Sequence, residues 1–84
     1  MAIKKTPEAI QTLKTDGERI AVLTAYDYPF ASILESAGAD MILVGDSLGM
    51  VVLGLPNTRF VTMDMMLHHT AAVRRGAPNT HIIG

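Results

Sequence analysis

The chain has 84 residues, of which 49% are hydrophobic and 18% are charged, and its formal net charge is −1. These values are typical of one small globular domain and exclude a disordered protein, and the scattered Lys and Arg residues argue against nucleic acid as a partner. Cysteine is absent, so the sequence offers neither a disulfide nor a thiolate metal site and is compatible with a reducing compartment.

The N-terminal segment indicates a cytoplasmic protein whose first element is a helix. Residues 1–5 lack the apolar core of a signal peptide, and no apolar stretch approaches the ~20 residues of a membrane span. We therefore expect a cytoplasmic protein that does not use a membrane as a partner. Thr6 then provides a hydroxyl cap, Pro7 suits the first helical position, and Gly17 is expected to end the helix.

Two apolar strands are predicted on either side of an amphipathic helix. Residues 20–24 and 41–44 are almost wholly apolar, which is typical of parallel strands buried on both faces. Pro29 opens the helix between them, and Gly38 ends it. The apolar positions expected to face inward are Phe30, Ile33, Leu34 and Ala37. Strand, crossover helix and strand within about 25 residues predict a right-handed βαβ unit.

The second half of the chain predicts an irregular segment, a long helix and a third strand. Residues 47–52 suit a short helical turn, and residues 53–61 suit a loop whose role is left open. Thr62 is expected to cap the next helix, and residues 81–83 to begin the third strand. The positions of this helix expected to face inward are Met63, Met66, Leu67 and Ala71.

This alternation of helices and strands predicts an α/β fold. A βα repeat of this spacing usually continues, to about 250 residues in a closed eight-stranded barrel. We therefore expect residues 1–84 to be a single partial domain, namely an N-terminal helix and the first βα units of an incomplete barrel. The alternative is a self-contained three-layer mini-domain.

Asp46 and Ser47 are the candidate site residues because they follow the second predicted strand directly. In α/β sheets and barrels, the residues just past the carboxyl end of a strand form the rim of the active site. Asp46 offers a hard carboxylate suited to Mg²⁺, and Ser47 a hydroxyl suited to a substrate carboxylate. Each residue could instead cap the following turn through its side chain.

Other polar residues carry weaker signals. Thr24, Tyr26 and Asp27 end the first strand at the same rim and could line a pocket, although Asp27 is better explained as the cap of the next helix. His68 and His69 diverge by roughly 100° on a helix and cannot share one metal ion, so we expect a surface pair. We assign no histidine to catalysis.

Three segments together resemble the ketopantoate hydroxymethyltransferase family. They are Thr-Ala-Tyr-Asp-Tyr at 24–28, Val-Gly-Asp-Ser-Leu-Gly-Met at 44–50 and His-Thr-Ala-Ala-Val-Arg-Arg-Gly-Ala-Pro at 69–78. The resemblance extends from about residue 5 to residue 84. It implies a (β/α)₈ TIM barrel of the phosphoenolpyruvate/pyruvate type.

The resemblance also implies an activity in pantothenate biosynthesis. The family transfers a hydroxymethyl group from the co-substrate 5,10-methylenetetrahydrofolate to 3-methyl-2-oxobutanoate, giving 2-dehydropantoate through a Mg²⁺-stabilised enolate. Asp46 then looks like a metal-site carboxylate that also meets the substrate, and Ser47 like a substrate-binding residue. The small-molecule partners are the keto acid and the folate, and the full-length family forms homo-oligomers.

The resemblance places the catalytic base on a later strand, so we expect no catalytic base in this chain and no activity from the 84 residues alone. Two alternatives stay open. One is another Mg²⁺-dependent keto-acid lyase or mutase barrel. The other is a non-enzymatic fragment, or a half-barrel that assembles with a partner chain to cover its open edge.

Overall fold

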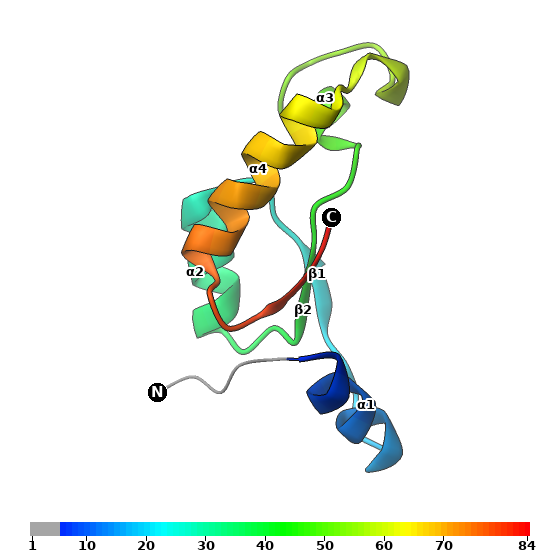
Figure 1. Cartoon of the computed structure of the whole chain (residues 1–84), viewed down its shortest axis with the longest axis vertical. Helices are drawn as coiled ribbons and strands as arrows, with labels where there is room; N and C mark the ends of the chain where they lie inside the picture. The colour runs from blue at the N-terminus through cyan, green and yellow to red at the C-terminus, as the bar shows by residue number, and fades with distance from the viewer. Residues whose placement is uncertain (1–5) are drawn as a thin grey trace.

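A small parallel sheet organises the part of the chain that the computed structural model describes, residues 6–84 (Figure 1). Its strands pair in the order β1 (Val22–Thr24), β2 (Met41–Leu43) and β3 (His81–Ile83). The helices are α1 (Pro7–Thr15), α2 (Tyr28–Ser36), α3 (Leu48–Val51), the 3-10 helix η1 (Thr58–Phe60) and α4 (Met63–Gly76). The predicted α/β class is confirmed, as is the parallel β1–α2–β2 unit.

Two predictions concern membranes and secretion. Among the described helices, none combines the length and apolar character needed to cross a bilayer. Residues 1–5, on which the argument against a signal peptide depends, lie outside the described residues.

Helices α1, α2 and α4 begin where the local sequence predicts, because each has a side-chain cap. In each case the side-chain oxygen accepts a hydrogen bond from the backbone N–H three residues later, at 3.1 Å for Thr6, 3.0 Å for Asp27 and 3.2 Å for Thr62. Gly17 follows α1 with a φ of 76°, the left-handed conformation of a helix C-terminus. The cap readings of all three residues are therefore confirmed.

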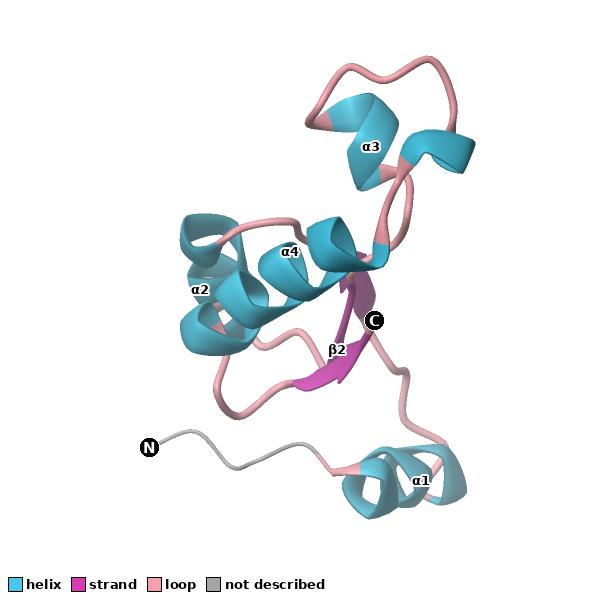
Figure 2. Cartoon of the chain, turned by 45° about the horizontal axis from the view of Figure 1, so that its top comes forward, coloured by secondary structure: helices cyan, strands magenta, loops and turns pink. Residues whose placement is uncertain are grey.

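The prediction that the strands are buried on both faces is wrong. Ile42 is fully buried beneath the helices, whereas the next residue, Leu43, is 38% exposed. Successive side chains of a strand point to opposite faces, so Leu43 lies in the row that faces away from α2 and α4. The register completes this row as Thr24, Leu43 and Ile83. The described helices α2 and α4 lie together on one face of the sheet, as Figure 2 shows, and leave this row uncovered.

Helices α2 and α4 pack against each other through small residues. Ala31 is fully buried and Gly76 is buried beside it. A Cβ atom added to Gly76 would collide with the carbonyl oxygen of Tyr28 and lie 3.0 Å from the Cβ of Ala31. Only a glycine at this position permits such a close approach of the two helices.

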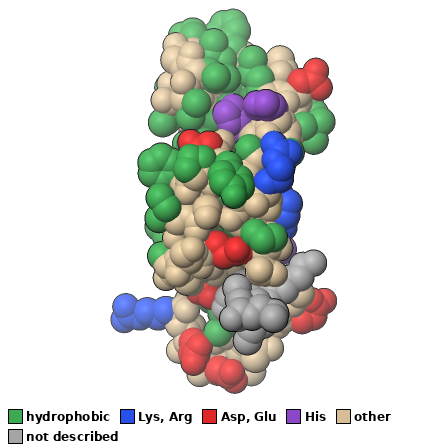
Figure 3. Space-filling model, turned by 90° about the vertical axis from the view of Figure 1, so that its left-hand side faces the viewer, with side chains coloured by type: hydrophobic (Ala, Val, Ile, Leu, Met, Phe, Trp, Pro, Cys, Tyr) green, Lys and Arg blue, Asp and Glu red, His purple; other side chains and the backbone are tan. Residues whose placement is uncertain are grey.

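Most of the predicted inward positions of the two helices are wrong. Small residues make the contact between the helices, and the larger apolar side chains lie outside it; Figure 3 shows hydrophobic side chains on this side of the molecule. The exposed fractions of these larger side chains lie between 60% and 72%: Phe30, Ile33, Met63 and Leu67. Leu67 and Ala71 line an open hollow with Ile82 beside β3, where no described element covers them. Ala37 and Ala71 are exposed as well, whereas Leu34 and Met66 are half-buried against the core.

The segment before β3 is held by side chains from both helices. Nη1 of Arg74 in α4 donates to three carbonyl oxygens within residues 77–80, at 3.0 to 3.2 Å. Oε1 of Glu35 in α2 accepts from the backbone N–H of Asn79 at 2.7 Å and from the buried hydroxyl of Thr80 at 2.9 Å. These bonds fix where β3 begins.

Replacing Glu35 by alanine is expected to lower the free energy of unfolding by about 1–3 kcal/mol, because the hydroxyl of Thr80 loses its partner while only 1% exposed. Urea denaturation of the complete gene product measures this. Glu35→Gln is the matched control, since it keeps an acceptor oxygen and should recover most of the loss. Equal midpoints for the wild type and Glu35→Ala would contradict the expectation.

Candidate functional site

The loops after β1 and β2 lie at the same edge of the sheet because the two strands are parallel. Asp46 and Ser47 lie between β2 and α3, as predicted, and Figure 1 shows α3 beyond this edge. The Asp46 side chain is exposed and makes no hydrogen bond or ion pair with any described residue. Its backbone carbonyl accepts from the N–H of Gly49 at 3.1 Å, so the backbone begins the helical turn while the carboxylate is left available.

Ser47 occupies the N-cap position of α3 but makes no side-chain cap. Its hydroxyl instead lies 2.6 Å from the hydroxyl of Tyr26, which follows β1. Both residues are half-buried. The contact joins the ends of two neighbouring strands across 21 positions of sequence.

His69 also contacts Tyr26 and is half-buried, so the expectation of a surface histidine pair is wrong for this residue. Ser47, Tyr26 and His69 form a polar cluster. Nδ1 of His69 lies 2.7 Å from the backbone carbonyl oxygen of Tyr26. A carbonyl oxygen only accepts, so Nδ1 of His69 is the donor in this contact. His68 is exposed as expected, and its ring meets that of His69 edge-on at 5.4 Å between centroids.

The spacing of apolar residues in α4 indicates that His69 lies on the inner side of this helix. His69 lies three residues after Met66 and four before Val73, and both of these pack in the core. Tyr26 had no comparable signal, because its contacts depend on two segments distant in sequence. Of the other rim residues, Asp27 caps α2, and Thr24 lies exposed in the uncovered row of the sheet.

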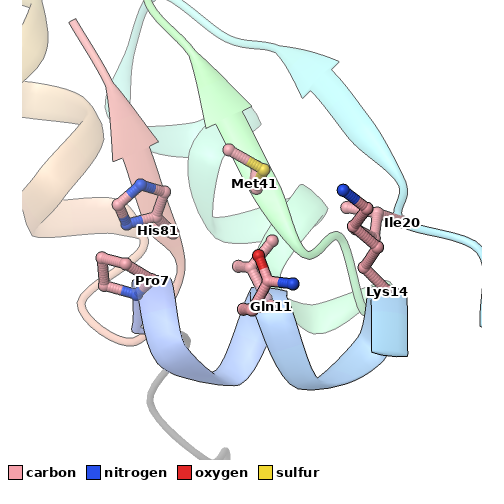
Figure 4. A pocket seen from close by; sticks show the side chains of 7 residues that line it. Pro7, Gln11, Lys14, Ile20, Met41 and His81 are labelled. Carbon is pink, nitrogen blue, oxygen red and sulfur yellow. The ribbon is translucent and has the colours of Figure 1, made fainter. Parts of the chain in front are cut away.

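A cavity lies at the opposite end of the strands, between α1 and the sheet (Figure 4). It measures about 190 Å³, and Met41 and His81 point into it from the first residues of β2 and β3. Helix α1 contributes Pro7 and Gln11 to its lining. The cavity is mostly apolar and lies at the end of the strands opposite the polar cluster. We therefore interpret it as space left where α1 packs against the sheet, and not as the candidate site.

Comparison with known proteins gives a consistent match along the chain. The family model described as ketopantoate hydroxymethyltransferase matches residues 4–84. The 3-methyl-2-oxobutanoate hydroxymethyltransferase of Listeria monocytogenes serotype 4a (strain HCC23) is 60% identical over 79 residues, which are 94% of this chain and 28% of that protein. The protein of the same name from Ignicoccus hospitalis is 58% identical over 81 residues, 96% of this chain and 31% of its own length. That from Geobacillus kaustophilus is 65% identical over 71 residues, 84% of this chain and 25% of its own. The chain therefore spans less than a third of the length of these relatives.

Proposed function

Because this chain belongs to the ketopantoate hydroxymethyltransferase family, we propose that it supplies part of a site that transfers a hydroxymethyl group from 5,10-methylenetetrahydrofolate to 3-methyl-2-oxobutanoate, giving 2-dehydropantoate. The observation that carries the proposal is the exposed carboxylate of Asp46 beside the Ser47 hydroxyl at the carboxyl end of a parallel strand. The names of the relatives support the reaction.

We further propose that the described elements are the first units of a (β/α)₈ barrel. The parallel sheet, with α2 and α4 on one face, supports this. The uncovered row of Thr24, Leu43 and Ile83 would then point into the barrel. Helix α1 would close the end of the barrel at which the strands begin. The apolar side chains exposed on α2 and α4 would contact further helices or other copies in the homo-oligomer that the family resemblance implies.

The residues present fit a magnesium site that is completed by other groups. Within residues 6–84 no three His, Asp or Glu side chains gather around one point. Magnesium, however, is usually held by one or two carboxylates together with water and substrate oxygens. Asp46 suits this, since its carboxylate is exposed and uncommitted. When bound there, Mg²⁺ supplies a Lewis acid that stabilises negative charge developing on the keto oxygen.

The chain's own contribution is to bind and orient the keto acid. Asp46 holds the metal side of the site, and the Ser47 hydroxyl donates to the substrate carboxylate, a charge-assisted hydrogen bond. We assign the base that removes the C3 proton to a later strand, as the family resemblance implies. On this proposal the 84 residues alone supply only some of the contacts to the keto acid and do not catalyse the formation of 2-dehydropantoate.

The test is an assay of the complete gene product with 3-methyl-2-oxobutanoate, 5,10-methylenetetrahydrofolate and Mg²⁺, with 2-dehydropantoate as the measured product. We expect turnover that is lost on chelation with EDTA and restored by added Mg²⁺. A parallel sample of the 84-residue chain should form no product. Cleavage or rearrangement of a keto acid without hydroxymethyl transfer would instead favour a lyase or mutase.

A further inference from the structure

Two hydrogen bonds link three residues from separate segments, namely His69, Tyr26 and Ser47. Nδ1 of His69, in the middle of α4, donates to the carbonyl oxygen of Tyr26 at 2.7 Å. The hydroxyl of Tyr26 meets the hydroxyl of Ser47 at 2.6 Å. Tyr26 is thus held at its backbone by α4 and at the tip of its ring by the loop after β2.

The position of Ser47 makes this contact informative. Ser47 has helical backbone angles, with φ −57° and ψ −15°, and makes no side-chain cap. The N–H groups of Gly49 and Met50 already donate to the carbonyl oxygens of Asp46 and Ser47. The turn therefore leaves the Ser47 hydroxyl to Tyr26, whose hydroxyl sets its direction.

We propose that Tyr26 and His69 are positioning residues that direct the Ser47 hydroxyl so that it donates to the carboxylate of the keto acid. This inference rests on the proposed function of Ser47. An anionic carboxylate can only accept, so Ser47 then donates to the substrate and Tyr26 donates to Ser47. Consecutive donation in one direction polarises each hydroxyl and strengthens the last bond of the chain. His69 acts one step further back, by fixing the backbone from which the Tyr26 ring projects.

The first test measures affinity of the complete gene product for 3-methyl-2-oxobutanoate by calorimetry, with Mg²⁺ present and folate absent. Tyr26→Phe keeps the ring and removes the hydroxyl, and should weaken binding about three- to tenfold. Ser47→Ala should weaken binding at least as much. The double variant should bind no more weakly than Ser47→Ala alone, because Tyr26 acts only through Ser47.

The second test separates positioning by His69 from a general packing role. His69→Ala should weaken keto-acid binding by about the same factor as Tyr26→Phe. His69→Asn should restore it, because the asparagine amide nitrogen lies as many bonds from Cα as Nδ1 does, whereas His69→Gln should not. His68→Asn, at the exposed neighbour, is the matched control and should bind as the wild type does.

The outcomes distinguish this inference from the proposed function. Wild-type protein that fails to bind the keto acid would overturn both. Wild-type binding with unchanged affinity in Tyr26→Phe would overturn the inference alone, as would additive losses in the double variant. Equal losses in His69→Ala and His69→Asn would remove His69 from the chain of positioning residues. Increases in KM for the keto acid larger than decreases in kcat would support positioning in the steady-state assay.

Discussion

Asp46→Ala in the complete gene product is expected to reduce kcat/KM for 2-dehydropantoate formation by about 10³-fold or more. A metal that stabilises developing charge contributes several kcal/mol, and about 4 kcal/mol corresponds to this factor. The fold should be unaffected, because the Asp46 side chain is exposed and bonded to no described residue. Steady-state kinetics measure the loss, and thermal unfolding of the same samples measures the fold.

The Mg²⁺ dependence makes this prediction specific. If Asp46 is a metal ligand, Asp46→Asn should shift half-maximal activity to a higher Mg²⁺ concentration, because a neutral amide oxygen binds the ion more weakly than a carboxylate does. Asp16→Ala is the matched control, since Asp16 is also exposed and ends α1, which lies at the opposite end of the strands. Normal turnover in Asp46→Ala would remove Asp46 from the site.

Gly76→Ala is expected to lower the free energy of unfolding by about 1–3 kcal/mol, the usual cost of overpacking a core. The added methyl group would collide with the backbone carbonyl of Tyr28, and a backbone atom has little freedom to move aside. This steric cost outweighs the gain in helix propensity, which is about 1 kcal/mol at most. Urea denaturation of the complete gene product measures the change.

Gly45→Ala is the control for this prediction. A Cβ atom at Gly45 would have the Ser47 Oγ as its nearest neighbour, at 3.6 Å, which is ordinary van der Waals contact. Stability should therefore change little. If Gly76→Ala is as stable as the wild type, then α2 and α4 do not approach each other as closely as described.

The sequence was sufficient for features that depend on neighbouring residues. The caps Thr6, Asp27 and Thr62 each involve a bond over three positions, and all three were predicted correctly. The order of strands and helices followed from apolar runs and from glycine and proline. The boundaries of the strands were less accurate: β1 begins at Val22 rather than at residue 20, and β2 ends at Leu43 rather than at residue 44.

The features that were missed depend on which elements meet. The apolar stripes of α2 and α4 were identified as inward faces, but the two helices meet through Ala31 and Gly76, and Leu67 faces an open hollow beside β3. The sequence placed Asp46 and Ser47 correctly after the second strand. It could not show that Tyr26 meets Ser47, because that contact depends on how two distant segments pack. The role of Asp46 toward a metal stays a prediction until the assay is made.

The long sequence separation of the bonds to α4 and β3 has a kinetic consequence. His69 and Tyr26 are 43 positions apart, and Thr80 and Glu35 are 45 positions apart. Contacts between distant residues close large loops, and their entropic cost is met only after local helices have formed. During refolding, the helical circular dichroism signal should therefore recover before the Tyr26–Ser47 contact forms. The ability to recognise a ligand at this rim would then be the last property that a newly folding molecule acquires.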